Sequence, residues 1–236
     1  MTNILLTGSS RGIGAAIATA LDLPGINLIG HGTSSGTGSG IAADFADPEA
    51  PAALWHAALE RFCGQIDILI NNAGVFEENP IGQDDAAWIA NWNRTMQINL
   101  TASAVLCRLA VRHWQDRAAP GRIINIASRA AYRGDSPAHW HYAASKAGMV
   151  AMTKTIARGY AREGILAFAI CPGFTMTGMA EDYLSSRGGD KLLADIPLGR
   201  VADPSEVATA ARFLALKAPP SMTGAVLDIN GASYVR

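Results

Sequence analysis

The sequence predicts an α/β fold in one domain, a doubly wound parallel sheet of about seven strands with helices on both faces. Short apolar runs alternate with longer segments of helical period along the chain, which is typical of right-handed βαβ units. The short runs are nearly all apolar, as strands buried on both faces are. No repeat, long linker or change in composition divides residues 1–236, so we expect a single domain.

The strand candidates are the short apolar runs. The third is the weakest of them, because it is short and begins with a glycine. In chain order we expect strands at Asn3–Thr7, Ile26–Gly30, Gly40–Ala43, Ile66–Asn71, Arg122–Ser128, Leu166–Cys171 and Ala225–Ile229.

The helix candidates place apolar side chains at helical spacing. The start of the last one is marked by Asp203 as N-cap, Pro204 at the first helical position and Glu206 three residues after the cap. In chain order we expect helices at Gly12–Leu21, Pro51–Phe62, Asp85–Asn99, Ala102–Gln115, Tyr142–Arg162 and Ser205–Leu216.

The composition excludes several functional classes. Nineteen Lys and Arg residues stand against twenty Asp and Glu, without a block of like charge, which argues against a nucleic-acid partner. The run Ile165–Cys171 is too short to cross a bilayer, and the first residues do not form a signal peptide. Three widely spaced cysteines indicate neither a disulfide framework nor a zinc site. We therefore expect a cytoplasmic protein with no membrane contact and no metal.

A segment rich in Gly, Ser and Thr, Gly32–Gly40, separates the second and third strand candidates. Most folds of this type place a helix there, but this composition cannot form one. Either the segment is a flexible loop that has replaced the helix, or its hydroxyl and amide groups contact a cofactor phosphate.

The segment Thr7–Gly14 joins the first strand to the first helix and is rich in glycine. Such a turn lets backbone amides approach a pyrophosphate, which the helix N-terminus stabilises electrostatically. We expect Gly8 to permit the tight turn, Gly12 the close approach and Gly14 the packing of helix on strand.

Tyr142 and Lys146 are four residues apart at the start of a predicted helix, so they project from one face. A free phenol titrates near 10, and a nearby ammonium group favours the phenolate, so we expect Lys146 to lower the tyrosine pKa. Ser128 ends a predicted strand at its carboxyl end, where ligands bind in open α/β sheets. An exposed helix face is the alternative for the Tyr–Lys pair taken alone.

These motifs, together with Asn71-Asn72-Ala73-Gly74 and Pro172-Gly173, stand in an order that resembles the short-chain dehydrogenase/reductase family. The resemblance runs from Thr7 to Tyr234 and so covers nearly the whole chain. It implies a Rossmann fold, an NAD(P) cofactor and hydride exchange between the nicotinamide and a carbonyl or alcohol.

The resemblance also implies roles for four catalytic residues. Tyr142 would protonate the carbonyl oxygen during reduction, and Lys146 would hold the ribose hydroxyls of the nicotinamide half. Ser128 would hydrogen-bond the substrate oxygen, and Asn99 would hold a relay water near the lysine. The spacing from Ser128 to Tyr142 is one residue longer than is usual in the family, an extra residue that the intervening loop can absorb.

The family's pattern places Asp44 against the adenine, Asn72 to Gly74 along the adenosine ribose, and Thr175 and Thr177 near the carboxamide. The second strand ends without the acid that NAD-specific members carry, whereas Arg11 offers positive charge to a 2′-phosphate, so we favour NADP(H) over NAD(H). His31, Thr33 and Ser34 are candidate hydrogen-bond partners of that phosphate. In full, we expect cofactor contacts at Gly8, Ser10, Arg11, Gly12, Ile13, Gly14, His31, Thr33, Asp44, Phe45, Asn72, Ala73, Gly74, Tyr142, Lys146, Pro172, Gly173, Thr175 and Thr177.

Substrate contacts are expected from Ser128, Tyr142 and His139. His139 and His141 could alternatively share a metal, but no third ligand is evident, so we expect no metal site. The segment Met176–Ile196 is interpreted as a lid over the substrate. The helices that contain Ala102–Gln115 and Tyr142–Arg162 correspond to those that pair between subunits in this family, which implies a homodimer or homotetramer.

The leading hypothesis is an NADPH-dependent reductase resembling the 3-oxoacyl-(acyl-carrier-protein) reductase branch, because of Ser9–Gly14, Pro197–Arg200 and the Asn230-Gly231 ending. Its substrate would be a carbonyl compound such as an acyl thioester. Sugar, polyol and other secondary-alcohol dehydrogenases share these features and remain an alternative. A cofactor-binding regulator without catalysis is the alternative of another class, and an epimerase or dehydratase would need a larger substrate domain.

Overall fold

The computed structural model describes residues 1–34, 40–176 and 193–236. Its strands form one seven-stranded sheet in the order β3-β2-β1-β4-β5-β6-β7, and every neighbouring pair is parallel. This confirms the predicted fold class. The strands are β1 (Thr2–Leu6), β2 (Ile26–Gly32), β3 (Ile41–Ala42), β4 (Ile68–Asn71), β5 (Gly121–Ile126), β6 (Ile165–Pro172) and β7 (Val226–Ile229).

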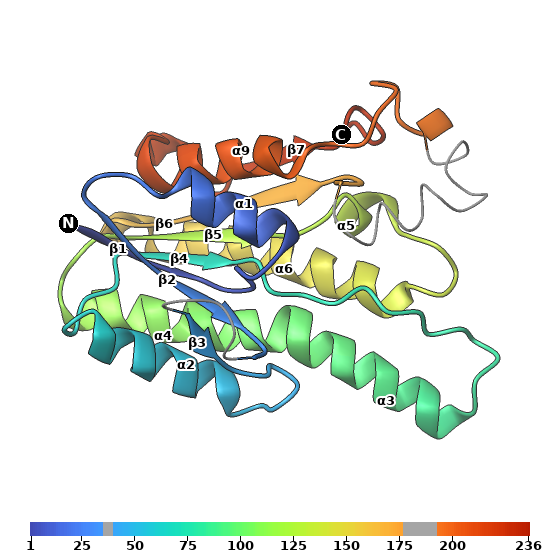
Figure 1. Ribbon diagram of the computed structural model, residues 1–236, viewed down its shortest axis with the longest axis horizontal. Helices are drawn as coiled ribbons and strands as arrows, with labels where there is room; N and C mark the ends of the chain where they lie inside the picture. Colours follow the sequence, from blue (N-terminus) through green and yellow to red (C-terminus); the bar gives the residue numbers. More distant parts are fainter. Residues whose placement is uncertain (35–39, 177–192) are drawn as a thin grey trace.

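Helices cover both faces of the sheet, as Figure 1 shows. One face packs against α1 and α9, and the other against α2, α4 and α6, so that two apolar cores flank the central strands. The helices are α1 (Gly12–Ala20), α2 (Ala50–Arg61), α3 (Asp85–Met96), α4 (Ala102–Asp116), α5 (Ala130–Arg133), α6 (Trp140–Tyr160) and α9 (Pro204–Leu216). None of the described helices is both long enough and apolar enough to span a membrane.

The chain leaves β1 toward one side of the sheet and β4 toward the other, and these two strands are neighbours. In open α/β sheets, this reversal of strand order opens a crevice at the carboxyl ends of the strands. The glycine-rich turn follows β1 and the Asn72–Gly74 segment follows β4, so both predicted cofactor motifs border this crevice.

The edge strand β3 is much shorter than the central strands. It pairs with β2 only through His31 with Ile41 and Gly32 with Ala42. Residues 35–39 of the Gly/Ser-rich segment lie outside the described residues, so the two interpretations of that segment stay open.

Several predicted boundaries were wrong. The helix expected over Asp85–Asn99 ends at Met96 and continues as a π-helical turn, Gln97–Thr101, which contains Asn99. The strand expected to reach Ser128 ends at Ile126. The segment expected to be a loop before Tyr142 contains α5, and α6 already begins at Trp140. Local periodicity cannot show these shifts, because they depend on contacts between elements.

The predicted start of the last helix is confirmed in detail. The Asp203 carboxylate accepts a hydrogen bond from the Ser205 N–H at 2.8 Å, and the Glu206 carboxylate accepts one from the Asp203 N–H at 2.7 Å. This capping box satisfies backbone donors that the first helical turn leaves without partners.

Candidate active site

The glycine-rich turn after β1 is folded more tightly than residues with a Cβ would allow. Gly8 has φ +66° and Gly12 has φ +55°, in the left-handed region that favours glycine. A Cβ on Gly8 would lie 2.7 Å from the Ala73 Cα, and a Cβ on Gly14 would collide with the Gly8 carbonyl oxygen. The turn therefore fits closely between the start of α1 and the segment after β4.

Hydrogen bonds from both neighbouring segments hold this turn. The Thr7 hydroxyl accepts from the backbone N–H groups of Asn72 and Ala73, at 2.9 and 3.0 Å. The Asn72 side-chain amide donates to the carbonyls of Thr7 and Gly8. Thr7 is thus a positioning residue, a role that was not predicted for it, and the Asn72 side chain supports the turn.

The first turn of α1 lies at this crevice without a side-chain cap. Arg11 occupies the N-cap position, makes no capping hydrogen bond and has an exposed side chain. An uncapped helix N-terminus with a neighbouring guanidinium is suited to bind an anionic group such as a pyrophosphate. Gly12, Ile13 and Gly14 form the start of that helix, and Ser10 is exposed on the turn before it.

At the end of β2 the structure corrects one prediction. The His31 ring was expected to bind a phosphate, but its Nδ1 lies 3.1 Å from the Gly8 N and its Nε2 2.8 Å from the Ala43 carbonyl oxygen. Both ring nitrogens therefore have partners within the chain. Thr33 is exposed and can contact a ligand, and so can the neighbouring Ser34.

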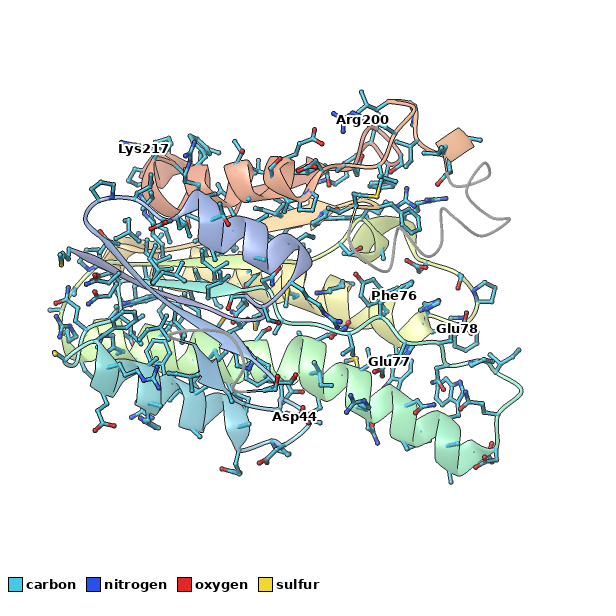
Figure 2. All side chains as sticks on the ribbon, in the orientation of Figure 1. Asp44, Phe76, Glu77, Glu78, Arg200 and Lys217 are labelled. Carbon is cyan, nitrogen blue, oxygen red and sulfur yellow. The ribbon has the colours of Figure 1, made fainter. Side chains whose placement is uncertain are left out.

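The segment after β3 brings the exposed Asp44 to the same region, while the Phe45 side chain packs into the apolar core. Asp44 is exposed, and its Oδ1 accepts from the Ala46 N–H at 3.0 Å, which leaves its other oxygen available. Phe45 is buried and stacks on the His31 ring with centroids 4.3 Å apart. Figure 2 shows Asp44 beside β3, on the side of the sheet that carries α2.

Ser128, Tyr142 and Lys146 come together beyond the carboxyl end of β5. The Ser128 side chain lies close enough to the Tyr142 phenol to influence its pKa, and the Ser128 hydroxyl accepts from the Ala130 N–H at 3.1 Å. The Lys146 Nζ lies 5.8 Å from the centre of the Tyr142 ring and donates to the Ile126 carbonyl at 3.0 Å. The longer serine–tyrosine spacing therefore does not separate the two side chains.

The pKa directions differ from the sequence-based expectation. Burial raises the pKa of Tyr142 to about 12, while its hydrogen bond with Ser128 acts in the opposite direction. Burial also lowers the pKa of Lys146 to about 8. The expected lowering of the tyrosine pKa by Lys146 is therefore wrong: desolvation dominates, and Tyr142 is protonated at neutral pH.

The Asn99 side chain ties the π-helical turn to the segment after β4. Its Oδ1 accepts from the Val75 N–H at 2.8 Å, and its Nδ2 donates to the Val75 carbonyl at 2.9 Å and to the Ser145 hydroxyl at 3.3 Å. A Cβ on Gly74 would lie 3.2 Å from Asn99 Oδ1 and 3.4 Å from Lys146 Nζ. Asn99, Gly74 and Lys146 therefore meet in one place.

Two aromatic side chains, Phe76 and His139, lie beside Tyr142. Phe76 contacts the Tyr142 ring edge-on at 4.7 Å and stacks on His139 at 3.9 Å, and His139 Nδ1 lies 2.6 Å from the Ser136 hydroxyl. Figure 2 shows Phe76 next to the start of α6, with Glu77 and Glu78 close by. Sequence reasoning missed Phe76, although an aromatic residue so soon after the Asn72–Gly74 motif was a usable signal.

The segment after β6 completes the site. The Pro172 carbonyl accepts from the Arg129 N–H at 2.9 Å, and Gly173 passes so close to Asn230 that a Cβ would lie 2.8 Å from the Asn230 Cβ. The buried Thr175 donates to the Gly173 carbonyl at 3.2 Å. Thr177 and most of the predicted lid, Met176–Ile196, lie outside the described residues.

The comparisons with known proteins agree with this geometry. The family model described as enoyl-(acyl carrier protein) reductase matches residues 8–232. A 3-oxoacyl-(acyl-carrier-protein) reductase FabG from Vibrio cholerae is 35% identical, over 98% of this chain and 96% of that protein. The 3beta-hydroxysteroid dehydrogenase 1 of Eggerthella lenta is also 35% identical, over 97% and 92% of the two chains.

A solved structure from Agrobacterium tumefaciens, provisionally assigned as a 2-deoxy-D-gluconate 3-dehydrogenase with bound NADP, has a TM-score of 0.86 and 27% identity to this chain. The similarity covers 100% of this chain and 97% of that one. The whole fold and the order of motifs are therefore shared with dehydrogenases and reductases. The chain belongs to the short-chain dehydrogenase/reductase family and is an oxidoreductase that interconverts a secondary alcohol and a carbonyl with NAD(P).

Proposed function

We propose that the protein reduces a 3-oxoacyl thioester to the 3-hydroxy compound with NADPH. The arrangement of Ser128, Tyr142 and Lys146 beyond the end of β5 carries this proposal, because a protonated tyrosine beside a serine hydroxyl suits reduction of a carbonyl. The thioester class is supported by the relatives named 3-oxoacyl-(acyl-carrier-protein) reductase, which match nearly the full chain.

Each catalytic residue has a defined task in this mechanism. Tyr142 donates its proton to the carbonyl oxygen, and Ser128 polarises the same oxygen through a hydrogen bond. Lys146 binds ribose hydroxyls through its ammonium group, and Asn99 fixes the neighbouring backbone and a relay water. The reduced nicotinamide, when bound, supplies the hydride. Substrate contacts beyond Ser128 and Tyr142 come from His139.

The residues around the crevice fit a dinucleotide. The uncapped start of α1 and the close turn at Gly8 receive the pyrophosphate, and Asp44 and Phe45 lie at the adenine end. Arg11 gives the preference for the 2′-phosphate of NADP(H), with Thr33 as a further hydrogen-bond partner. Thr175 and Thr177 are assigned to the carboxamide, following the family's pattern. The related structure from Agrobacterium tumefaciens is described with NADP.

A steady-state assay tests the proposal directly. The purified protein is given a short 3-oxoacyl thioester with NADPH or NADH, and consumption of the reduced cofactor is followed by absorbance. We expect turnover with NADPH to exceed that with NADH. Binding of cofactor without any turnover of the thioester would contradict the proposed substrate.

A sugar or other secondary-alcohol dehydrogenase is the second candidate, since the relatives also include a steroid dehydrogenase and a provisionally assigned sugar dehydrogenase. Oxidation of such alcohols with NADP⁺ or NAD⁺, together with inactivity on the thioester, would support it. A regulator without catalysis is distinguished by Tyr142→Phe, which would leave a purely regulatory effect unchanged.

We further propose a homodimer or homotetramer, in one domain per chain and located in the cytoplasm. Small residues on α6, such as Ala143, Ala147 and Ala151, support close packing of this helix against a second subunit. Light scattering of the purified protein gives the oligomeric state, and a monomer at micromolar concentration would contradict the proposal.

A further inference from the structure

His31 is bonded to two segments that border the proposed cofactor site. Its carbonyl oxygen accepts from the Ser9 N–H at 2.8 Å and from the Ser9 hydroxyl at 3.3 Å. Its ring bridges the Gly8 N–H and the Ala43 carbonyl oxygen, at 3.1 and 2.8 Å, and stacks on Phe45 at an interplanar angle of 13°. One residue in β2 therefore joins the glycine-rich turn to the segment after β3.

The two partners of the ring determine its protonation state. The Gly8 N–H can only donate, so Nδ1 must present a lone pair, and the Ala43 carbonyl can only accept, so Nε2 must carry the hydrogen. Both bonds therefore need the neutral imidazole. A second proton, on Nδ1, would point at the Gly8 N–H and replace a hydrogen bond by a contact between two donors.

The surroundings favour the neutral ring. His31 is 2% exposed, and burial lowers its pKa below the ordinary value of 6.5, although the bond to Ala43 and the charge of Asp44 act in the opposite direction. Asp44 is the charged group that acts on the ring from the segment after β3. The bridge is thus complete at neutral pH and is lost when acidification protonates the ring.

The bridge matters because few backbone hydrogen bonds join β3 to the rest of the sheet. β3 pairs with β2 through two residues, and the Ala43 N–H adds a bond of 2.9 Å to the Gly32 carbonyl. The ring then fixes the Ala43 carbonyl immediately before Asp44 and Phe45. Losing the bridge would remove one bond from the turn at the pyrophosphate and one from the segment at the adenine together, while Asn72 still supports the turn and Gln97 still donates to the Phe45 carbonyl.

We propose that His31 is a positioning residue for cofactor binding: its neutral ring locks the Gly8 turn to the Ala43–Phe45 segment, and a second proton on the ring weakens binding of the adenosine half. This inference rests on the proposed use of an NAD(P) cofactor. Because both ring nitrogens are bonded to the chain itself, we expect the effect for NADP⁺ and NAD⁺ alike.

Isothermal titration calorimetry of the full chain with NADP⁺ and with NAD⁺, at about pH 7.5 and about pH 5.5, tests the proposal. One hydrogen bond lost corresponds to a rise in Kd of at most about fivefold, which is approached as the pH falls below the lowered pKa of the ring. In His31→Asn the amide oxygen can still accept from Gly8 but cannot titrate, so we expect this rise to be absent. The matched control His56→Asn removes an exposed histidine of α2 and should keep the wild-type rise.

The use of two cofactors distinguishes the titration of His31 from the titration of the ligand. The 2′-phosphate of NADP⁺ itself titrates at about pH 6, so a rise confined to NADP⁺ would belong to the phosphate and would overturn the role of His31. An unchanged rise in His31→Asn would also overturn it. If the cofactor binds with the expected pH dependence but no carbonyl compound is reduced, the proposed function fails while this inference stands. If neither cofactor binds, both the proposed function and this inference are refuted.

A nitrogen NMR spectrum of the wild-type protein supplies a test that needs no variant, so a folding defect cannot affect its result. The proposal requires His31 at neutral pH to be the tautomer with hydrogen on Nε2 and a bare Nδ1. Hydrogen on Nδ1, or a charged ring at about pH 7.5, would overturn the proposal.

Discussion

The two halves of the crevice are built in different ways. The catalytic half lies among the central strands β4, β5 and β6, where Asn99, Ser128 and Lys146 are buried and each bonds a neighbouring segment. The adenosine half lies toward the edge of the sheet, where β3 has two paired residues and His31 supplies the bridge. The catalytic half is fixed by several elements at once, whereas the other half depends on a few local contacts.

This contrast has a functional meaning. A site for proton donation needs accurate geometry, because an error of about 1 Å between reacting groups can cost a large part of the rate. A site for the adenosine end needs affinity and selectivity, which a few hydrogen bonds and one charge can supply. We therefore expect substitutions in the catalytic half to reduce kcat and substitutions in the adenosine half to change Kd.

The largest effect is expected for Tyr142→Phe. Removing the hydroxyl leaves the carbonyl oxygen without its proton donor, so kcat should fall by about a thousandfold or more, with cofactor affinity nearly unchanged. Steady-state kinetics and cofactor titration measure the two quantities. Tyr160→Phe, at the far end of the same helix α6, is the matched control and should retain activity. A loss shared by both variants would mean that α6, rather than the catalytic hydroxyl, had been disturbed.

Asn99→Ala should test how strongly the catalytic half is fixed. The change leaves the N–H and carbonyl of Val75 without partners, so we expect a loss of about 3 kcal/mol in the free energy of unfolding, together with reduced kcat. Chemical denaturation measures the free energy of unfolding. Asn91→Ala on α3 removes a half-buried bond to Gln83 and should cost less than about 1 kcal/mol. Equal losses in the two variants would contradict a special role for Asn99.

The sequence predicted those features that depend on residues close together in the chain. The Tyr142–Lys146 pair and the turn at Gly8 are of this kind, because helical spacing and strand–helix junctions can be recognised locally. The parallel sheet followed from the alternation of apolar runs with helical periods. These parts of the fold and site were within reach of sequence reasoning.

Features that depend on residues far apart in the chain could not be predicted from the sequence. The π-helical turn at Asn99 continues the apolar period of a helix, so only its bonds to Val75 and Ser145 distinguish it. The role of His31 depends on Gly8 and Ala43, which lie on either side of it in the sequence and meet through the pairing of strands. The pKa of Tyr142 depends on burial, which the lysine spacing does not reveal.

In the adenosine half, Arg11→Ala should separate the two cofactors. An exposed guanidinium that meets a phosphate contributes a charge-assisted bond, so we expect about a tenfold rise in the Kd of NADPH and little change for NADH. Fluorescence titration of both cofactors measures the ratio. Arg158→Ala removes an exposed arginine of α6 and should leave both affinities unchanged. An equal rise for NADPH and NADH would exclude selection of the 2′-phosphate by Arg11.

The smallest effect concerns the pH dependence of Lys146, whose pKa is lowered to about 8 by burial. Above that pH the amine becomes neutral and loses its charge-assisted bonds to a ribose, so the cofactor Kd should rise about fourfold between pH 7 and 8.5, in proportion to the loss of the charged form. Lys146→Met should abolish the rise, whereas Lys154→Met, an exposed lysine of the same helix, should keep it.

Cofactor binding through Lys146 should weaken as the pH rises, whereas the contribution of Lys146 to folding stability should increase. Between the folded pKa of about 8 and the ordinary value of 10.5, the unfolded chain binds more protons than the folded one, so the contribution of Lys146 to stability increases with pH. Denaturation of the wild type and Lys146→Met at several pH values measures this difference. If the cofactor Kd fell above about pH 8 while the free energy of unfolding rose, the charged amine of Lys146 would not be what binds the cofactor. The catalytic half would then take part in the reaction without contributing to cofactor affinity.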